Sequence, residues 1–292
     1  MANLKEIRNR IVSISSTKQI TSAMKMVSAA KLRRAQDAIT QMRPYSKKLQ
    51  EILENLSVGL DSSEGVYSQE REVKNVLFVS ITANRGLCGG FNNNVIKTVK
   101  RIAETDYKNC EVTIVSIGKK SMDSFKLSPA AVKGKEVFSK SVEIIDNLTF
   151  EYASEVAQLL MNQFADKKQD KIVLVYNQFK NAAVQEIQVE QFLPVVPTAN
   201  ESTTSSTAEY IYEPNKEFII EELIPKSLKT QLFKALLDSQ ASEHGARMTA
   251  MHKATDNATD LINDLKLSYN KARQAAITNE ILEIVAGAEA LN

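Results

Sequence analysis

Residues 225–292, PKSLKTQLFKALLDSQASEHGARMTAMHKATDNATDLINDLKLSYNKARQAAITNEILEIVAGAEALN, decide the fold of this chain. No proline follows Pro225, and only Gly245 and Gly287 interrupt a run of residues that favour a helix. The positions that alternate in steps of three and four form one stripe: Met251, Ala254, Ala258, Leu261, Leu265, Ser268, Ala272, Ala275, Asn279, Leu282 and Ala286. Such a stripe over about five heptads predicts one helix of a coiled coil. At ~1.5 Å per residue this helix is on the order of 90 Å long, so it needs a partner helix and a surrounding protein.

The partner helix is predicted in residues 3–43, which contain neither glycine nor proline. Asn3 and Glu6 have the spacing of a capping box at its start. A heptad register begins on apolar residues and continues through four polar ones: Leu4, Ile7, Ile11 and Ile14, then Lys18, Thr21, Lys25 and Ser28. The apolar residues shift to a neighbouring face and then return: Ile20, Met24 and Val27, then Leu32, Ala35, Ile39 and Met42. This drift predicts a loose, irregular supercoil, and we expect Pro44 to kink a helix that resumes through Leu56.

The composition suits a protein of two domains with unevenly placed charge. The chain has 292 residues, of which 43% are hydrophobic, enough for two domains and a real core. Residues 1–50 carry eleven Lys and Arg against two acidic residues, whereas residues 221–292 carry eight against ten. The two arms therefore attract each other, and a basic face remains for an acidic partner.

Neither the cysteines nor the hydropathy indicate a secreted or membrane-spanning chain. Cys88 and Cys110 are too few for a disulfide scaffold, so we expect reduced thiols in a cytosolic compartment. No apolar run approaches the roughly eighteen residues of a membrane span, and Lys5, Arg8 and Arg10 break any signal peptide. The basic start is close to a transit peptide in composition, but its stripe continues past residue 30, which favours mature structure.

Between the arms the pattern changes to alternating strands and helices. Residues 59–72 are polar and indicate a linker, and residues 73–212 are expected to form an α/β domain. Strands are predicted at Val76–Thr82, Val112–Ile117, Ile172–Tyr176 and Val184–Leu193, the last antiparallel to its neighbour. Helices are predicted at 91–106, in a short stretch toward Phe125, and at 147–168. The expected fold is a Rossmann-like α/β domain with a mostly parallel sheet, inserted between helical arms at 1–58 and 214–292.

A glycine turn after the first predicted strand is the most chemistry-like feature. Gly86, Gly89 and Gly90 lie between a strand and a helix, where backbone amides could hold a phosphate group. The turn lacks the lysine and hydroxyl residue of an ATP-binding loop and the G-x-G-x-x-G spacing of a dinucleotide site. We therefore favour a structural turn. The alternative is a small nucleotide-binding α/β enzyme with helical dimerisation arms.

No other residue set indicates catalysis, a cofactor or a metal. The two histidines, His244 and His252, lie eight residues apart on one predicted helix with no ligand set beside them. A coiled-coil protein that binds nucleic acid through the basic arm is a further alternative. Against it, the first fifty residues hold one aromatic residue, Tyr45, and no known nucleic-acid-binding module.

The last turns of the C-terminal helix are apolar on several faces: Ile277, Ile281, Leu282, Ile284, Val285, Ala288 and Leu291. A helix that is apolar all round is enclosed by other groups, so we predict that a partner forms a sleeve around this tip. Fraying or oligomerisation of the isolated chain is the alternative.

Three stretches resemble the γ subunits of F-type ATP synthases. Residues Ser15–Gln36, SSTKQITSAMKMVSAAKLRRAQ, resemble the N-terminal signature of that family, and Ile81–Asn94, ITANRGLCGGFNNN, resemble its central motif. Residues Ser242–Leu291 resemble its C-terminal signature nearly throughout. These motifs bracket the whole chain and are highly specific, so the chain is identified as a member of this family.

The resemblance implies a rotary role without catalysis by the chain itself. In this family the two long helices form an antiparallel coiled coil, the central rotor shaft inside a ring of α and β subunits that hold the nucleotide sites. The inserted domain lies at the foot, where it meets the ε subunit and the membrane c-ring. Proton-driven rotation cycles the β subunits through ATP synthesis, and the reverse gives hydrolysis and proton pumping. The chain would bind no ATP and no other cofactor.

The resemblance also implies a place and a lineage. The complex would hold the chain at the cytoplasmic face of a bacterial inner membrane, as a peripheral protein. The inserted cysteine pair of chloroplast relatives is missing, which favours a bacterial form without a thiol switch. Gly245 stands where alanine is usual, at a cost of ~1 kcal/mol of helix propensity if exposed.

Contact roles follow from the resemblance residue by residue. Met24 matches a position facing the β subunit, and Tyr210 matches a foot position near ε. Coupling between rotor and ring is assigned to Lys18, Lys25, Arg247, Gln274, Thr278 and Glu280. The segment Gln274–Glu280 is expected to interact with the region Lys18–Met26. The apolar bearing at the tip is assigned to Ile281, Leu282, Val285 and Leu291.

Overall fold

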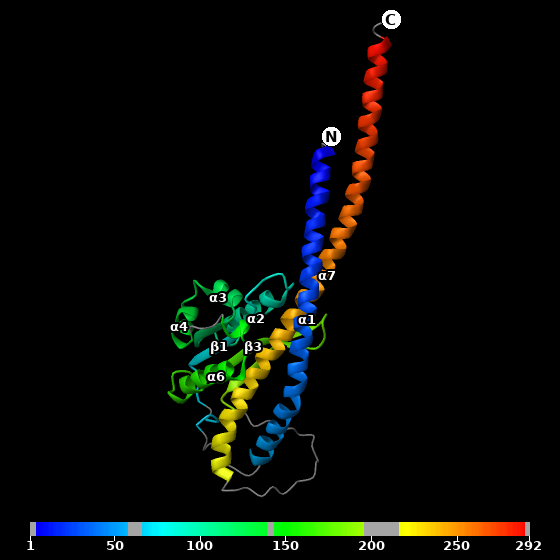
Figure 1. Cartoon of the computed structure of the whole chain (residues 1–292). Helices are drawn as coiled ribbons and strands as arrows, with labels where there is room; N and C mark the ends of the chain where they lie inside the picture. The colour runs from blue at the N-terminus through cyan, green and yellow to red at the C-terminus, as the bar shows by residue number, and fades with distance from the viewer. Residues whose placement is uncertain (1–3, 58–65, 70, 139–142, 196–215, 290–292) are drawn as a thin grey trace. The chain divides into compact units, whose positions relative to one another are not determined.

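The computed structural model describes residues 4–57, 66–69, 71–138, 143–195 and 216–289. The chain forms two compact units: a helical unit, residues 1–29 with 247–292, and an α/β unit, residues 30–246. Helix α1 (Leu4–Ser57) and helix α7 (Lys216–Glu289) each contribute to both units (Figure 1). The two long helical arms predicted from the sequence are thereby confirmed.

In the helical unit, α1 and α7 form an antiparallel pair. Thr21 Oγ1 lies 2.9 Å from Thr255 Oγ1, and Lys25 Nζ lies 3.3 Å from His252 Nδ1. Residue numbers rise along α1 as they fall along the α7 positions that it contacts. The helices therefore run in opposite directions, as predicted.

The heptad register of α1 passes through its polar positions without a shift, so the predicted drift of the stripe is wrong. Thr21 and Ser28 are buried, while the apolar Ile20 and Val27 are exposed by 60% and 57%. The two hydroxyls donate to carbonyl oxygens about one turn earlier in their own helix, at 3.0 and 2.8 Å. Burial leaves neither hydroxyl unpaired, and the geometry of the pair decides which face is covered.

On α7, the buried stripe matches the predicted one at one of its two heptad positions and differs from it at the other. Met251 and Ala258 are buried as predicted, and Leu265 and Ala272 continue the same position half-buried: the shared heptad position is confirmed. Leu261 and Ser268 are exposed, whereas Ile262 and Tyr269, each one residue later, are half-buried. The sequence offers an apolar side chain at both 261 and 262, so spacing alone did not choose between them.

The pairing ends well before α7 does. The antiparallel register that joins Thr21 to Thr255 places Leu4, the first described residue of α1, opposite about Ala272. Residues 273–288 of α7 are all exposed. The overhang of the C-terminal helix, which the sequence left open, is therefore about four turns.

The α/β unit is built on a four-stranded mixed sheet in the order β2-β1-β3-β4. Strand β1 (Asn75–Ile81) pairs in parallel with β2 (Glu111–Ile117) and β3 (Lys171–Phe179), and β4 (Gln185–Leu193) pairs antiparallel with β3. All four predicted strands and their directions are confirmed. Strand β3 is four residues longer than predicted, because it begins one residue earlier, at Lys171, and ends three residues later, at Phe179.

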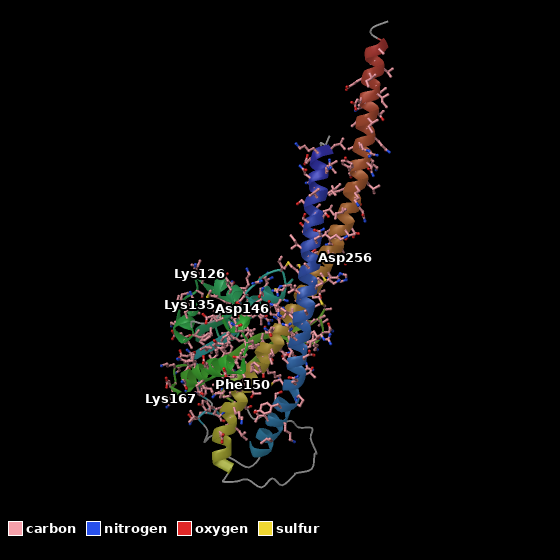
Figure 2. The ribbon with its side chains drawn as sticks, viewed as in Figure 1. Lys126, Lys135, Asp146, Phe150, Lys167 and Asp256 are labelled. Carbon is pink, nitrogen blue, oxygen red and sulfur yellow. The ribbon has the colours of Figure 1, made fainter. Side chains whose placement is uncertain are left out.

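Helices cover both faces of this sheet. Helix α2 (Phe91–Thr105) buries Val95 and Val99 against one face. Helix α6 (Phe150–Ala165) and α7 bury the other, through side chains such as Leu160 and Leu232. Phe150, labelled in Figure 2, makes an edge contact with Phe233 of α7 at 5.5 Å between ring centroids. The α/β fold inserted between two long helices is as predicted.

Three features of this unit differ from the sequence prediction or add to it. The short helix α3 (Lys119–Phe125) is confirmed, but residues 128–145, which had no assignment, hold α4 (Pro129–Val137) and α5 (Glu143–Asp146). Helix α7 begins nine residues before Pro225, so this proline lies inside the helix. The added first turns are held because Ile224 packs against the core shared by the sheet and α6.

Candidate functional site

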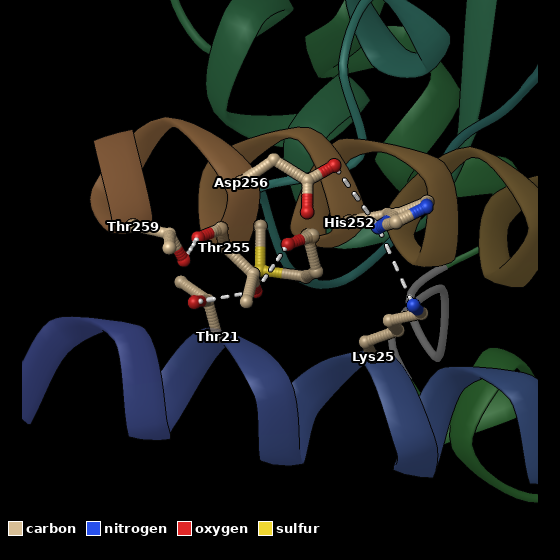
Figure 3. Close-up of polar contacts among 7 residues, drawn as sticks. Thr21, Lys25, His252, Thr255, Asp256 and Thr259 are labelled. Atoms are coloured by element: carbon tan, nitrogen blue, oxygen red, sulfur yellow. Dashed lines mark hydrogen bonds and ion pairs between the residues drawn. The ribbon is translucent and has the colours of Figure 1, made fainter. Parts of the chain in front are cut away.

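A polar cluster joins α1 and α7 within the helical unit (Figure 3). Its centre is the hydroxyl pair of Thr21 and Thr255, 2.9 Å apart. One turn away, His252 Nδ1 lies 3.3 Å from Lys25 Nζ and 3.3 Å from Asp256 Oδ2. The cluster therefore contains two direct bonds between the helices, Thr21–Thr255 and Lys25–His252, and the same histidine nitrogen also faces the carboxylate of Asp256 on α7.

This cluster fixes how far one helix can slide along the other. Small side chains such as Ala254 and Ala258 fit at neighbouring registers almost equally well, because apolar packing has no direction. Each threonine hydroxyl can also bond a carbonyl oxygen of its own helix, but the bond between the two hydroxyls forms at one register only, as bonds between polar seam residues do in other coiled coils. The Thr21–Thr255 bond thus opposes the axial slip that a load on either helix would produce.

Replacing either threonine of the pair by valine tests this role. We expect Thr21→Val and Thr255→Val each to destabilise the helical unit by ~0.5–1.5 kcal/mol, and the double variant to lose less than the sum. Thermal unfolding followed by circular dichroism measures the three losses. Exactly additive losses would show that the hydroxyls do not interact, and Thr278→Ala, which removes a bond within α7 only, is the matched control.

Two of the predicted coupling residues, Lys18 and Lys25, contact this cluster, and Met24, which is predicted to face the β subunit, lies between them in the sequence of α1. Lys18, Met24 and Lys25 are all half-buried on α1. The carbonyl oxygen of Lys18 accepts from Thr21, and Lys25 contacts His252. Their predicted contacts with other subunits remain predictions, but their side chains lie on or beside the seam rather than on the outer face of α1.

The predicted coupling residues of α7 lie in two places. Arg247 is buried, 8% exposed. Gln274, Thr278 and Glu280 are exposed in the overhang, and Thr278 Oγ1 donates to the Gln274 carbonyl at 2.9 Å. Gln274 follows Thr255 by nineteen residues, about 28 Å along the helix.

The expected interaction of Gln274–Glu280 with Lys18–Met26 is therefore not made within this chain. The antiparallel register sets Lys18–Met26 against the part of α7 around residues 251–258. Any coupling between the two segments has to pass along the helices or through another protein.

The predicted bearing residues are exposed on this overhang. Ile281, Leu282 and Val285 are exposed by 54%, 59% and 50%, and Ile277 and Ile284 accompany them. Apolar side chains in such number, left exposed by the part of the chain that the structure describes, are typical of a protein interface. Two further predicted contacts, Leu291 and Tyr210, lie outside the described residues.

Sequence reasoning missed an outer apolar row on α1. Val12, Ile20, Met26 and Val27 are exposed by 57–65% and lie away from the seam. The sequence did contain this information, because these four residues fall outside the strict heptad positions that begin at Leu4. An unbroken register would have placed them on the outer face, where a surrounding protein could contact them.

The glycine turn is closed by its own side chains. Gly89 has a φ of 58°, and Gly90 forms the N-cap of α2. Asn92 accepts from the backbone N–H of Ala83 at 2.9 Å and donates to Cys88 Sγ at 3.2 Å. Ala83 and Cys88 also belong to a small apolar cluster with Phe91 and Ala246. These contacts anchor the turn to α7 within the α/β unit.

The described residues lack two further features, a cluster of metal ligands and a membrane-spanning helix. No group of three or more His, Cys, Asp or Glu side chains there is placed to hold a metal ion. No helix in the same residues is both long and apolar enough to cross a membrane.

Comparison with known proteins identifies the family. The sequence model of the ATP synthase family matches residues 3–291. The chain is 62% identical to the ATP synthase gamma chain of Christiangramia forsetii and 61% identical to that of Flavobacterium johnsoniae, each alignment covering all of both chains. The rotor of the Euglena gracilis mitochondrial ATP synthase shares the fold, with a TM-score of 0.64 at 22% identity over 94% of this chain and 98% of that one. A chain of the central stalk and c-ring of the Tetrahymena thermophila enzyme matches with a TM-score of 0.56 at 24% identity, over 80% and 99%. The antiparallel helical pair, the inserted α/β domain and these full-length identities together show that the chain belongs to the ATP synthase gamma chain family.

Proposed function

We propose that the helical unit carries the contacts through which this subunit transmits rotation. As a gamma chain, the protein is the non-catalytic central rotor stalk of an F-type ATP synthase. The observation that carries the proposal is the overhang of α7, whose residues 273–288 are exposed and include five large apolar side chains. A surface of this kind calls for a surrounding partner.

The partners are assigned by similarity and by surface. One copy would stand inside a ring of α and β subunits, which enclose the overhang and the outer apolar row of α1. The α/β unit would meet the ε subunit, with Tyr210 near that contact, and the c-ring. The subunit belongs to a membrane-associated complex. We place it at the cytoplasmic face of a bacterial inner membrane because its close relatives are bacterial.

The mechanism requires that each orientation of the shaft favour a different conformation of a catalytic subunit. A ligand or partner shifts such an equilibrium only by its difference in affinity for the two states. The shaft has the asymmetry that this needs, since an apolar row covers one face of α1 and the overhang consists of a single helix. Exposed charged contacts on it, at up to about 1 kcal/mol each, can form and break at every step.

The family assignment overturns the alternative of a nucleotide-binding enzyme with dimerisation arms. It also leaves no support for a nucleic-acid-binding coiled coil. In the glycine turn that suggested the enzyme, Asn92 bonds the Ala83 N–H and the Arg85 carbonyl, and the Phe91 N–H bonds the Cys88 carbonyl.

Reconstitution tests the proposal. The chain is mixed with α and β subunits of the same complex, and assembly and ATP hydrolysis are measured with and without it. We expect one copy per ring and stimulated turnover. A chain that left the ring unbound and its hydrolysis unchanged would contradict the proposed contacts.

Thr278→Ala and Glu280→Gln separate coupling from folding. Both side chains are exposed, so we expect the stability of the isolated chain to change by less than about 0.5 kcal/mol. If they contact the ring, the protons pumped per ATP hydrolysed should fall several-fold while the yield of complex stays constant. Asn263→Ala, an exposed change on the same helix before the overhang, is the control. Equal pumping by all three variants would remove Thr278 and Glu280 from the coupling contacts.

A further inference from the structure

A buried carboxyl group lies where α7 meets both α1 and the sheet, within the α/β unit. Asp238 of α7 is only 3% exposed. Its carboxylate accepts a hydrogen bond from the backbone N–H of Phe179, the last residue of β3. Its Oδ1 atom has no hydrogen-bond partner among the described residues. A buried oxygen without a hydrogen-bond partner costs folding free energy, so a functional role for this group has to be considered.

A small cavity lies beside this carboxyl group. Its lining comes from α1 and α7: Ile39, Met42, Arg43, Lys234, Leu237 and Asp238. It is about large enough for one water molecule. Both a polar oxygen and room for a hydrogen-bonding molecule are therefore present at the same place.

Charged groups face Asp238 from three elements. Lys234, one turn earlier on α7, and Arg43 of α1 favour its ionised form, whereas Glu190 of β4 opposes it. Glu190 is held in place, because it accepts from Tyr176 Oη of β3 and from Gln231 Nε2 of α7, both at 2.7 Å. The carboxylates of Asp238 and Glu190 thus share one region with two cations, of which only Arg43 comes from α1.

We propose that Asp238 and the cavity beside it form a proton-binding site whose charge decides how firmly α1 is held against α7 in the α/β unit. When the carboxyl is ionised, Arg43 is attracted across the helix boundary. When a proton binds, that attraction ends, and the neutral group can donate or accept a hydrogen bond with one water molecule in the cavity. Arg43 is exposed and free to turn toward solvent in that state.

Burial sets the pH range of this site. Burial raises the pKa of Asp238 from 3.8 to about 6, against the opposing effect of Lys234 and Arg43. A group with a raised folded-state pKa gives stability that is fully present below its unfolded pKa and is lost as pH rises through the folded value. The folded chain should therefore lose stability between about pH 4 and 6, by up to roughly a hundredfold in its unfolding equilibrium constant.

The full-length Asp238→Asn variant tests the site. Asparagine cannot ionise, so its unfolding equilibrium constant should match the parent chain below pH 4 and be up to roughly a hundredfold smaller above pH 6. Denaturant unfolding at a series of pH values measures both chains. Asp260→Asn, an exposed change on the same helix, should follow the parent profile. If the unfolding equilibrium constants of the parent chain and Asp238→Asn changed with pH in the same way, the proposal would be overturned.

If the asparagine variant does not fold, two further measurements test whether Asp238 binds a proton and whether its charge holds α1. The carboxyl carbon of Asp238, assigned by the loss of its signal in Asp238→Glu, should titrate in the parent chain near pH 6, and a midpoint near 3.8 would overturn the proposal. Arg43→Gln should raise that midpoint further, because it removes a cation. It should also abolish the pH dependence of hydrogen exchange around residues 39–46 of α1. Unchanged exchange in this variant would show that the charge of Asp238 does not hold α1.

Discussion

Leu261→Pro is expected to abolish coupling in the assembled complex while leaving the α/β unit folded. Residue 261 lies inside α7, between the buried Ala258 and the half-buried Ile262 of the seam. Proline removes a backbone N–H and its ring clashes with the carbonyl of Asn257, at a cost of ~3 kcal/mol or more. The helix would kink or break in its paired segment, beyond which the whole overhang lies.

Two measurements check this expectation. Circular dichroism of the isolated chain should show lost helix, and the reconstituted complex should hydrolyse ATP without pumping protons. Leu261→Ala is the matched control, because the side chain is 47% exposed and its loss should cost under about 1 kcal/mol. If the proline variant assembled and pumped like the alanine variant, α7 would not have to be continuous for transmission.

The parts of the fold that sequence reasoning predicted are those fixed by local preference. The long helices follow from stretches without turn residues, and the strands from β-branched runs such as Val112–Ile117. The polar seam could not be predicted from hydrophobicity, because Thr21 and Ser28 satisfy their hydroxyls within their own helix and are buried there at little cost. Because Thr21 and Ser28 face α7, Ile20 and Val27 lie on the exposed face of α1.

In the candidate site, too, some features could be predicted from local sequence and others could not. The apolar character of Ile281, Leu282 and Val285 predicted a partner at the tip, and the structure leaves these residues exposed. The distance between Gln274 and the Lys18 region depends on the register of two helices, which no local pattern contains. The buried Asp238 was equally out of reach, since its surroundings come from α1, β3 and β4, far apart in the sequence.

Helix α4 had no assignment because it is short and contains a glycine, a residue that weakens helices. The structure shows what Gly134 contributes. It lies directly against the backbone of strand β2, where an added Cβ would fall on the carbonyl oxygen of Ile114. Helix and strand backbones can approach this closely only where no side chain stands between them. The edge of β2 is covered by this contact, which also protects the strand from pairing with another chain.

Gly134→Ala should therefore destabilise the α/β unit, although alanine is the better helix former. The atom it meets is backbone, so α4 or β2 must shift, and overpacking of this kind costs ~1–3 kcal/mol or more. Gly287→Ala is the matched change, also inside a helix, with nothing within 4 Å of the added Cβ. There we expect a gain of ~0.5–1 kcal/mol in local helix stability and no loss elsewhere. Thermal unfolding should show opposite signs for the two variants. If both variants gained stability, helix propensity alone would determine the effect of each alanine, and α4 would not be packed against the backbone of β2.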